Sequence, residues 1–217
     1  DHFGRDVLSM IMTGAWNSLS IAIVAVTLGG AIGIVIGLVA AAVRGVFESV
    51  LMRLCDIIFA LPALLSAMML AAMIGAGRYT ATIAIAVFMI PVFARMTLGA
   101  AKQIWTLDYI LAAISLGRSK LAVTLVHILP NISGVIIVQF AIQIGMAVLT
   151  EAGLSFLGLG LPPPAPTWGR MLADAQTYLV SAPWLAIVPG MAIVLFVSGL
   201  NFFADGLRDW LDPKLRQ

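Results

Sequence analysis

Long apolar stretches alternate with short polar segments along the whole chain. Five stretches are free of charged residues over lengths that suit a membrane helix, which needs about 20 mostly apolar residues. They cover Ser18–Val43, Ile57–Gly77, Tyr79–Ala94, Ile132–Thr150 and Pro183–Ala204. Because unpaired backbone amides are costly in hydrocarbon, each stretch is predicted to be a membrane-spanning helix.

The third stretch is short, because Arg95 interrupts it. A charge at a helix centre costs about 2.5–3.5 kcal/mol on insertion scales. Residues Met96–Ala101 extend this span if Arg95 snorkels or faces protein. We then expect Arg95 to pair with a carboxylate that the sequence does not identify.

Composition supports the same class of protein. Hydrophobic residues make up 62% of the 217 residues and charged residues 10%, against about 45–50% and about 25% in soluble domains. The sequence therefore predicts an all-α polytopic membrane helix bundle in one domain, residues 1–217. The net charge of +2 gives no indication of nucleic-acid binding. The single cysteine, Cys55, excludes an internal disulfide and is expected to be apolar filler.

The distribution of Lys and Arg predicts the orientation, since these residues concentrate on the cytoplasmic side. One side would carry nine: Arg44, Arg53, Arg95, Lys102, Arg118, Lys120, Arg208, Lys214 and Arg216. The other would carry three: Arg5, Arg78 and Arg170. Residues 1–17 are therefore expected outside and the C-terminal tail, 205–217, in the cytoplasm. An odd number of spans with an external start predicts one more span upstream, six in the full protein.

Three glycines of the first span, Gly29, Gly33 and Gly37, recur every four residues and share one helix face. This spacing allows another helix to approach closely. The alternative is that membrane helices simply tolerate glycine; close packing is the favoured interpretation.

The segment 95–131, on the predicted inner side, is expected to fold as two short helices. Asp108 is of a type that caps a helix, and Gly117 can end one in a left-handed conformation. The second helix is expected over Ser119–Ile128, before Pro130 starts the next element. The first helix is either a passive interfacial helix or a docking helix for a cytoplasmic partner.

This segment resembles a known coupling loop. Ala112-Ala113-x-x-x-Gly117 followed by His127-x-x-Pro130 is similar to the EAA loop of binding-protein-dependent ABC importer permeases. The neighbouring residues Asp108, Tyr109 and Asn131 match its peptide and nickel branch. The resemblance implies that all of these residues couple the chain to an ATPase. Leu111 stands where the motif has glutamate, so docking through shape is expected here in place of a salt bridge.

Other segments resemble the same branch. Gly4–Ser9 is similar to its external pre-helix, Glu151–Gly160 with Pro162–Pro164 and Trp168 to its outer loop (151–183), and Asp205–Asp209 to its tail. The resemblance covers the whole chain and implies the second permease subunit of a dipeptide, oligopeptide or nickel importer. It implies a bacterial inner-membrane location and peptide cargo, with a nickel or other metal chelate as the alternative.

The family also implies the partners. These are a homologous permease in a heterodimer, two cytoplasmic ABC ATPase subunits, an extracytoplasmic substrate-binding protein and membrane lipid, with no nucleic acid. The chain has no Gly-rich Walker loop, so ATP and Mg²⁺ are expected on the ATPase subunits. No cofactor, metal site or catalytic residue is expected on this chain. An ion-coupled transporter is less favoured, because the span centres hold no charge, and no Gly-x-Ser-x-Gly elbow indicates a membrane enzyme.

Several polar and proline positions keep two interpretations. The rigid loop with Pro162, Pro163, Pro164 and Trp168 is either a lid at the outer mouth or a stiff connector with Trp168 at the membrane interface. Asp56 and Glu151 are expected to have structural pairing or capping roles, with direct transport roles as the alternative.

Two further groups of residues are assigned roles in packing. His127 is expected to cap or hydrogen-bond the coupling loop. Met68, Met69 and Met73 are expected to be filler, although soft metal ligands are the alternative.

Overall fold

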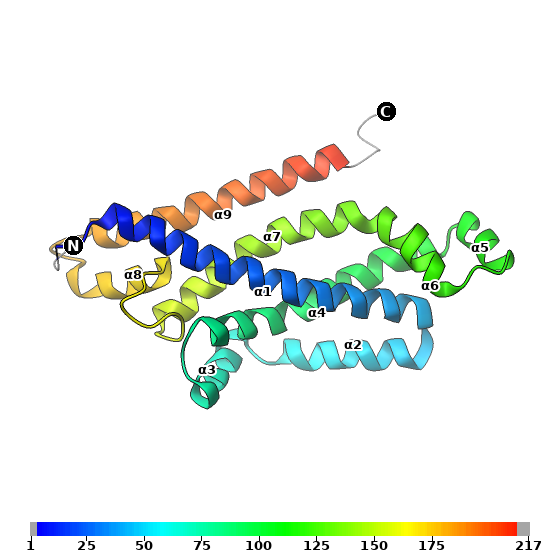
Figure 1. Cartoon of the computed structure of the whole chain (residues 1–217), viewed down its shortest axis with the longest axis horizontal. Helices are drawn as coiled ribbons and strands as arrows, with labels where there is room; N and C mark the ends of the chain where they lie inside the picture. Colours follow the sequence, from blue (N-terminus) through cyan, green and yellow to red (C-terminus); the bar gives the residue numbers. More distant parts are fainter. Residues whose placement is uncertain (1–3, 212–217) are drawn as a thin grey trace.

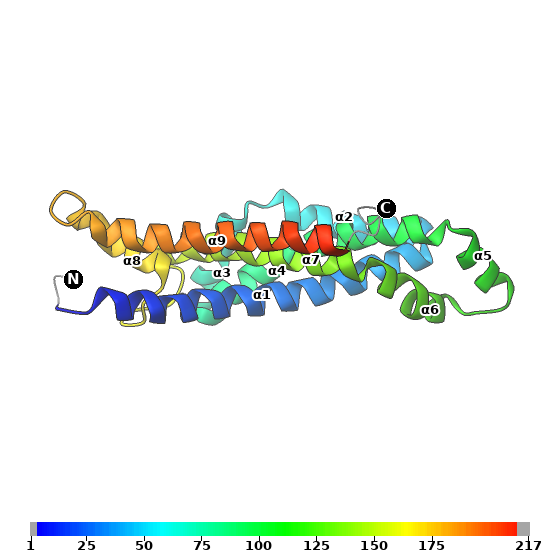
Figure 2. The same ribbon diagram turned by 90° about the horizontal axis from the view of Figure 1, so that it is seen from above.

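The structure, a computed structural model, describes residues 4–211, and its regular elements over that range are all helices. The tail residues 212–217, which belong to the predicted C-terminal tail, lie outside the described residues. The long helices run side by side along one axis (Figures 1 and 2). The elements are α1 (Val7–Val43), α2 (Gly45–Ala60), α3 (Ala63–Ile74), α4 (Arg78–Trp105), α5 (Asp108–Ser115), α6 (Lys120–Val123), the π-helical η1 (Thr124–Ile128), α7 (Leu129–Phe156), α8 (Trp168–Ala175), the 3₁₀ turn η2 (Gln176–Tyr178) and α9 (Trp184–Leu211).

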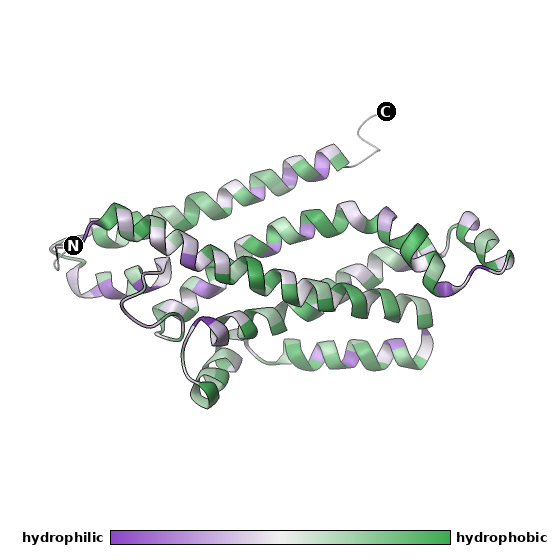
Figure 3. Cartoon of the chain, viewed as in Figure 1, coloured by the Kyte–Doolittle hydropathy of each residue, from purple (hydrophilic) through white to green (hydrophobic). Residues whose placement is uncertain are grey.

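Within the described residues, four helices are long and apolar enough to cross a membrane: α1, α4, the continuous Lys120–Phe156 and α9. The bent pair of α2 and α3 makes a fifth if it forms one span. Apolar residues colour most of the length of these helices (Figure 3). The predicted all-α membrane bundle is confirmed, with α5 and α8 at its opposite ends (Figure 1).

The first helix is longer than predicted. Residues 7–17, expected as a separate pre-helix, form the first turns of α1. The Asp6 carboxylate caps α1 by accepting hydrogen bonds from the Leu8 and Ser9 amides at 3.2 and 3.0 Å. A capped N-terminus satisfies two amides that would otherwise lack partners, so the helix begins there.

The glycine face of α1 packs directly on α4, as the spacing predicts. A Cβ atom on Gly29, Gly33 or Gly37 would overlap the backbone carbonyl oxygens of Ala86, Ile90 and Ala94 in turn. The two helices run parallel with the same four-residue step. The α4 backbone comes this close because α1 has no side chain at these three positions.

The second predicted span is not a straight helix. The chain breaks at Leu61 and Pro62, and the axes of α2 and α3 differ by 84°. Proline has no amide hydrogen to donate and disfavours a helical conformation in the residue before it, and Leu61 is extended. The prediction of one helix over 57–77 is therefore wrong, since α2 already begins at Gly45.

The third span continues past Arg95 to Trp105, as the predicted extension requires. Arg95 lies at the seam between α4 and α2, where its guanidinium pairs with the Asp56 carboxylate. The same guanidinium lies 5.3 Å from the centre of the Phe59 ring. Asp56 is thus the carboxylate that the sequence alone does not identify.

The second short helix of the inner loop is not separate from the following span. Helical backbone runs without a break through α6, η1 and α7, from Lys120 to Phe156. Ser119 begins this helix by accepting a hydrogen bond from the Ala122 amide at 3.3 Å. Pro130 lies near the start of α7 and does not interrupt the rod.

Candidate functional site

The end of the bundle that carries α5 holds the residues predicted to dock a partner. The short helix α5 is anchored by Ile110, which is fully buried against the core beneath it, with Ala113 packed beside it. Leu107, in an extended conformation, precedes the helix, and no side chain caps the N-terminus of α5. The prediction that Asp108 caps α5 is therefore wrong. Asp108 is instead the first helical residue, where its charge complements the helix dipole.

Gly117 ends α5 in the predicted left-handed conformation, with φ of 85°. The Gly117 amide donates to the Ile114 carbonyl at 2.9 Å, and the Arg118 amide donates to the Ala113 carbonyl at 3.2 Å. These two bonds form a Schellman motif, which satisfies carbonyls at the helix end. The turn that separates α5 from α6 is therefore fixed by hydrogen bonds.

His127 holds this loop together. Its ring meets the Tyr109 ring of α5 edge to face, with 6.3 Å between the centroids. Arg118 Nη1 lies 3.4 Å from His127 Nε2, and Asn131 Nδ2 donates to the His127 carbonyl at 2.5 Å. The predicted residues Tyr109, His127 and Asn131 are thus brought together, and His127 has the hydrogen bonds expected of it.

The π-helical segment explains how Pro130 fits inside a continuous helix. Proline offers no amide hydrogen to the carbonyl four residues earlier, that of Val126. Just before it, the Leu129 amide bonds to the Thr124 carbonyl five residues back. A single wide turn of this kind accommodates the missing donor, and such turns often occur at functional sites.

The outward face of this end is apolar and uncovered in the single chain. Leu111 and Tyr109 are about half exposed, at 51% and 47%, and Leu116 is 86% exposed at the tip. Ala112 lies beside them on the exposed side of α5. Clustered exposed apolar side chains mark protein-interaction surfaces. Leu111, Tyr109, Ala112 and Leu116 are called the α5 tip below.

At the opposite end, the predicted outer loop is tied to α1. Trp168 is 4% exposed, and its Nε1 donates to the Ile11 carbonyl at 3.1 Å. Its amide donates to Ser18 Oγ at 3.3 Å, and Asn17 Nδ2 donates to the Pro166 carbonyl at 2.8 Å. The interpretation of Trp168 as an aromatic anchor at the membrane interface is therefore wrong, because its ring packs inside the bundle. Pro162, Pro163 and Pro164 remain exposed on this loop.

Glu151 lies at the same end and is fully buried. Its Oε1 accepts a hydrogen bond from Ser155 Oγ at 2.5 Å. Arg78 donates to Asn17 Oδ1 and Ser20 Oγ, both at 2.8 Å, and forms no ion pair with Glu151. A structural role for Glu151 therefore rests on its hydrogen bond within α7.

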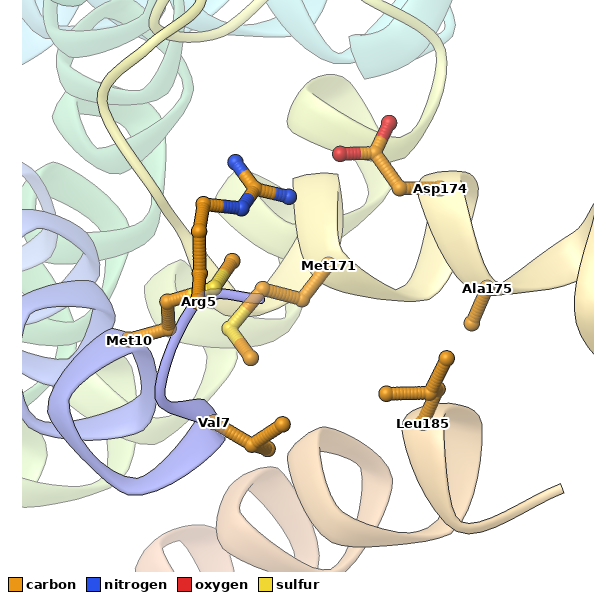
Figure 4. A pocket seen from close by; sticks show the side chains of 7 residues that line it. All are labelled: Arg5, Val7, Met10, Met171, Asp174, Ala175 and Leu185. Atoms are coloured by element: carbon orange, nitrogen blue, oxygen red, sulfur yellow. The ribbon is translucent and has the colours of Figure 1, made fainter. Parts of the chain in front are cut away.

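Figure 4 shows a shallow hollow at this end, between the start of α1, α8 and the start of α9. Val7, Met10, Met171, Ala175 and Leu185 give it an apolar lining, and the charged side chains of Arg5 and Asp174 complete it. Asp174 also pairs with Arg170, with 3.0 Å between Nε and Oδ1. The hollow carries no nucleophile or acid–base pair that would indicate catalysis.

The sequence does not single out Ile110, Arg118 or the partners of Arg78. Ile110 belongs to an apolar position in a short helix, where periodicity is weak. Arg118 follows the glycine turn, which is a signal that could have linked it to His127. Among residues 4–211, no three His, Cys, Asp or Glu side chains gather as a metal site. Met68, Met69 and Met73 are exposed on α3.

These features define a polytopic helical membrane protein with an exposed apolar surface at one end. Residues 33–217 match the family described as binding-protein-dependent transport system inner membrane component. Glutathione transport system permease protein GsiD of Pectobacterium atrosepticum is 43% identical over 216 residues, covering 100% of this chain and 72% of that protein. The corresponding protein of Escherichia coli O157:H7 is 42% identical, with 71% of it covered. This chain belongs to the family of binding-protein-dependent transport system inner membrane components, which are permease subunits of ABC importers.

The fold has counterparts among solved structures. Two inward-facing crystal forms of the MetNI methionine ABC transporter each contain a chain that superposes with TM-scores of 0.80 and 0.77. Both are 17% identical to this chain, and each superposition covers 94% of it. At this identity the likeness shows the shared permease fold.

Proposed function

We propose that the chain couples ATP hydrolysis on partner subunits to the import of peptide-like cargo, and that the α5 tip is the coupling element. The observation that carries the proposal is the exposed apolar tip on a rigidly supported helix. Ile110 anchors α5 from below, Gly117 fixes its turn, and His127 ties it to the helix that continues into α7. A partner that moves α5 therefore also moves the long helix behind it.

The coupling is a shift between two states. ATP binding on the partner favours one arrangement of the permeases and its release favours the other, provided that the contacts differ between them. The small side chain of Ala112 and the apolar side chain of Leu111 suit docking in a groove of the ATPase through shape complementarity. This fits a chain that has leucine where the family motif has glutamate.

The α5 end faces the cytoplasm in this proposal, and α8 faces the outside. Support comes from the Lys and Arg residues near the α5 end, because cytoplasmic segments are enriched in them. Arg118 and Lys120 lie in the loop itself, and Arg44 lies where α1 ends. α9 also ends toward this side, so the C-terminal tail is proposed to be cytoplasmic.

The working unit is a heterodimer of this chain with a homologous permease, two ABC ATPase subunits and an external binding protein. ATP and Mg²⁺ bind to the ATPase subunits, and this chain binds no cofactor. The outer loop, with Pro162–Pro164 exposed, lies near the docked binding protein as a fixed lip. Support for a fixed lip in place of a swinging lid comes from Trp168, which is bonded to Ile11 and Ser18.

The cargo proposed is a small peptide or a peptide-like molecule. The curated relatives described above are named glutathione permeases, and glutathione is a tripeptide. A metal chelate is the second candidate within the same family, supported only by the family's nickel branch.

The test is a purified complex of the chain with its genetic neighbours. An ATPase subunit is expected to co-purify, and ATP-driven peptide uptake into vesicles is expected for the wild type. Leu111→Arg places a charge on the α5 tip at a half-exposed position. It is expected to abolish uptake and ATPase co-purification.

A matched control is Leu179→Arg, which exposes a charge at the opposite end, where Leu179 is 50% exposed. Its uptake and its co-purification are expected to equal those of the wild type. Wild-type uptake by Leu111→Arg would contradict the coupling assignment.

A further inference from the structure

The seam between α2 and α4 carries charge inside the membrane. Asp56 pairs with Arg95 close to the end of α2, and Glu48 pairs with Lys102 close to its start, nearer the α5 end. The side chains of Asp56 and Arg95 are each 50% exposed. Polar positions interrupt the apolar colouring of α2 in Figure 3.

The depth of the pair follows from the length of α4. At 1.5 Å per residue, the 28 residues from Arg78 to Trp105 span about 42 Å. Arg95 then lies about 26 Å from the start of the helix and about 15 Å from its end. A hydrocarbon core of about 30 Å contains this residue wherever it is placed along an upright α4.

Contact with lipid is unfavourable for the half-exposed ion pair of Asp56 and Arg95. Ionisable side chains at membrane depth almost always face protein or a water-filled cavity, because hydrocarbon solvates charge badly. The single chain leaves the seam open: Cys55 is the one buried residue of α2. On α4, a Cβ atom at Gly99, one turn beyond Arg95, would meet nothing within 4 Å.

We propose that the α2–α4 seam lines the water-filled pathway, and that Asp56 and Arg95 bind the charged ends of a zwitterionic, peptide-like cargo. The assignment rests on the proposed function and adds the residues that contact the cargo. The pair is complementary to a zwitterion, since Arg95 binds a carboxylate and Asp56 an ammonium group. Because the pair is neutral as a whole, exchanging its internal bond for the cargo's two ends leaves no charge unpaired.

The first test is the water accessibility of the seam in the complete transporter. In a Cys55→Ala background, Gly99→Cys is expected to react with a small charged thiol reagent, and saturating zwitterionic dipeptide is expected to slow the reaction. Val35→Cys is the control, since Val35 on α1 is 59% exposed in the single chain and apolar. It is expected to react with neither the charged reagent nor a membrane-permeant maleimide, because a thiol in hydrocarbon does not ionise to the nucleophilic thiolate.

Two outcomes would overturn the proposal. Gly99→Cys inert to both reagents would place the seam against lipid or beneath the second permease. Reaction with the permeant maleimide alone would show that the charged reagent has no aqueous route to the seam.

The second test measures transport. Arg95→Gln is expected to lower maximal dipeptide uptake about tenfold or more, as loss of one charged hydrogen-bond partner does, while ATP hydrolysis stimulated by the loaded binding protein persists. The swap of Asp56→Arg with Arg95→Asp keeps an ion pair and is expected to restore stability but not uptake. If the swap restores uptake, the pair is purely structural and the proposal fails.

The proposed function and the pathway assignment can be rejected independently. A wild-type complex without ATP-driven uptake would reject the proposed function. A wild type that transports, with Gly99→Cys inert to the charged reagent, would reject only the pathway assignment.

Discussion

Gly33 of α1 lies against the backbone carbonyl of Ile90 on α4, with no room between them for a methyl group. A side chain at this position forces the two helices apart or distorts one of them. We expect Gly33→Leu to destabilise the bundle by about 1–3 kcal/mol or more, as overpacking does. Thermal stability of the purified protein in detergent measures the effect. Gly206→Leu is the control, because a Cβ there meets nothing within 4 Å.

Gly117 is the second glycine whose conformation matters. Its φ of 85° lies in the left-handed region, where other residues are strained by roughly 1–2 kcal/mol. Gly117→Ala is expected to reduce ATP-driven uptake through a distorted turn, and Gly117→Asn to retain more of it because asparagine tolerates this region. Equal uptake by both variants and the wild type would show that the turn does not contribute to coupling.

The orientation can be tested with single cysteines in a Cys55→Ala background. Leu116 is 86% exposed at the α5 tip, and Val180 is fully exposed at the opposite end. In the chain expressed without its ATPase partners, Leu116→Cys is expected to label only from the cytoplasm and Val180→Cys only from outside. Leu116 is a better probe than Ser119, because the Ser119 hydroxyl caps α6. The reverse labelling pattern would invert the topology.

Trp168 is expected to contribute strongly to the stability of the fold, although it lies beside a proline-rich loop. Trp168→Ala removes a buried aromatic side chain and should cost about 3–5 kcal/mol of stability. Trp184→Ala is the matched control, because Trp184 is 57% exposed. Chemical unfolding followed by fluorescence would compare them, and an equal loss in both would contradict the buried role of Trp168.

Asp6 gives a pH-dependent prediction at the start of α1. The hydrogen bond from the Ser9 hydroxyl, and then those from the Ser9 and Leu8 amides, hold the pKa of the Asp6 carboxyl below its ordinary value. A lowered folded-state pKa means that the stabilising effect is complete above about pH 4 and is lost as the pH falls through the folded pKa. The stability difference between wild type and Asp6→Ala should therefore be present at pH 7 and shrink in acid. Asp6→Asn keeps an acceptor and should show no such titration.

The sequence predicts features that follow from local chemistry. The glycine spacing of α1, the left-handed Gly117 and the extension of α4 past Arg95 each depend on one helix or one residue. The α5 residues are recognisable because their motif is local. Their docking role is a proposal that the experiments above test.

Predictions for features that depend on residues distant in sequence are wrong or leave the partner undetermined. The burial of Trp168 needs Ile11 and Ser18, about 150 residues away in sequence, and no pattern near Trp168 encodes them. The partner of Arg95 lies on another helix. The break at Pro62 is not predicted, because apolar residues continue on both sides of it and proline is tolerated in membrane helices.

The wide turn of η1 makes the fold sensitive to the number of residues between Val123 and Ile128. Val123 and Ile128 are both fully buried in one cluster although five residues separate them, whereas Ile132 and Ile136 follow at intervals of four. In a regular α-helix each residue advances about 100° around the axis, so the extra residue in the turn keeps both sides in phase. Removing one residue between them would swing the preceding loop about 100° around the rod. The number of residues in this turn, more than their identity, therefore sets the direction in which α5 points.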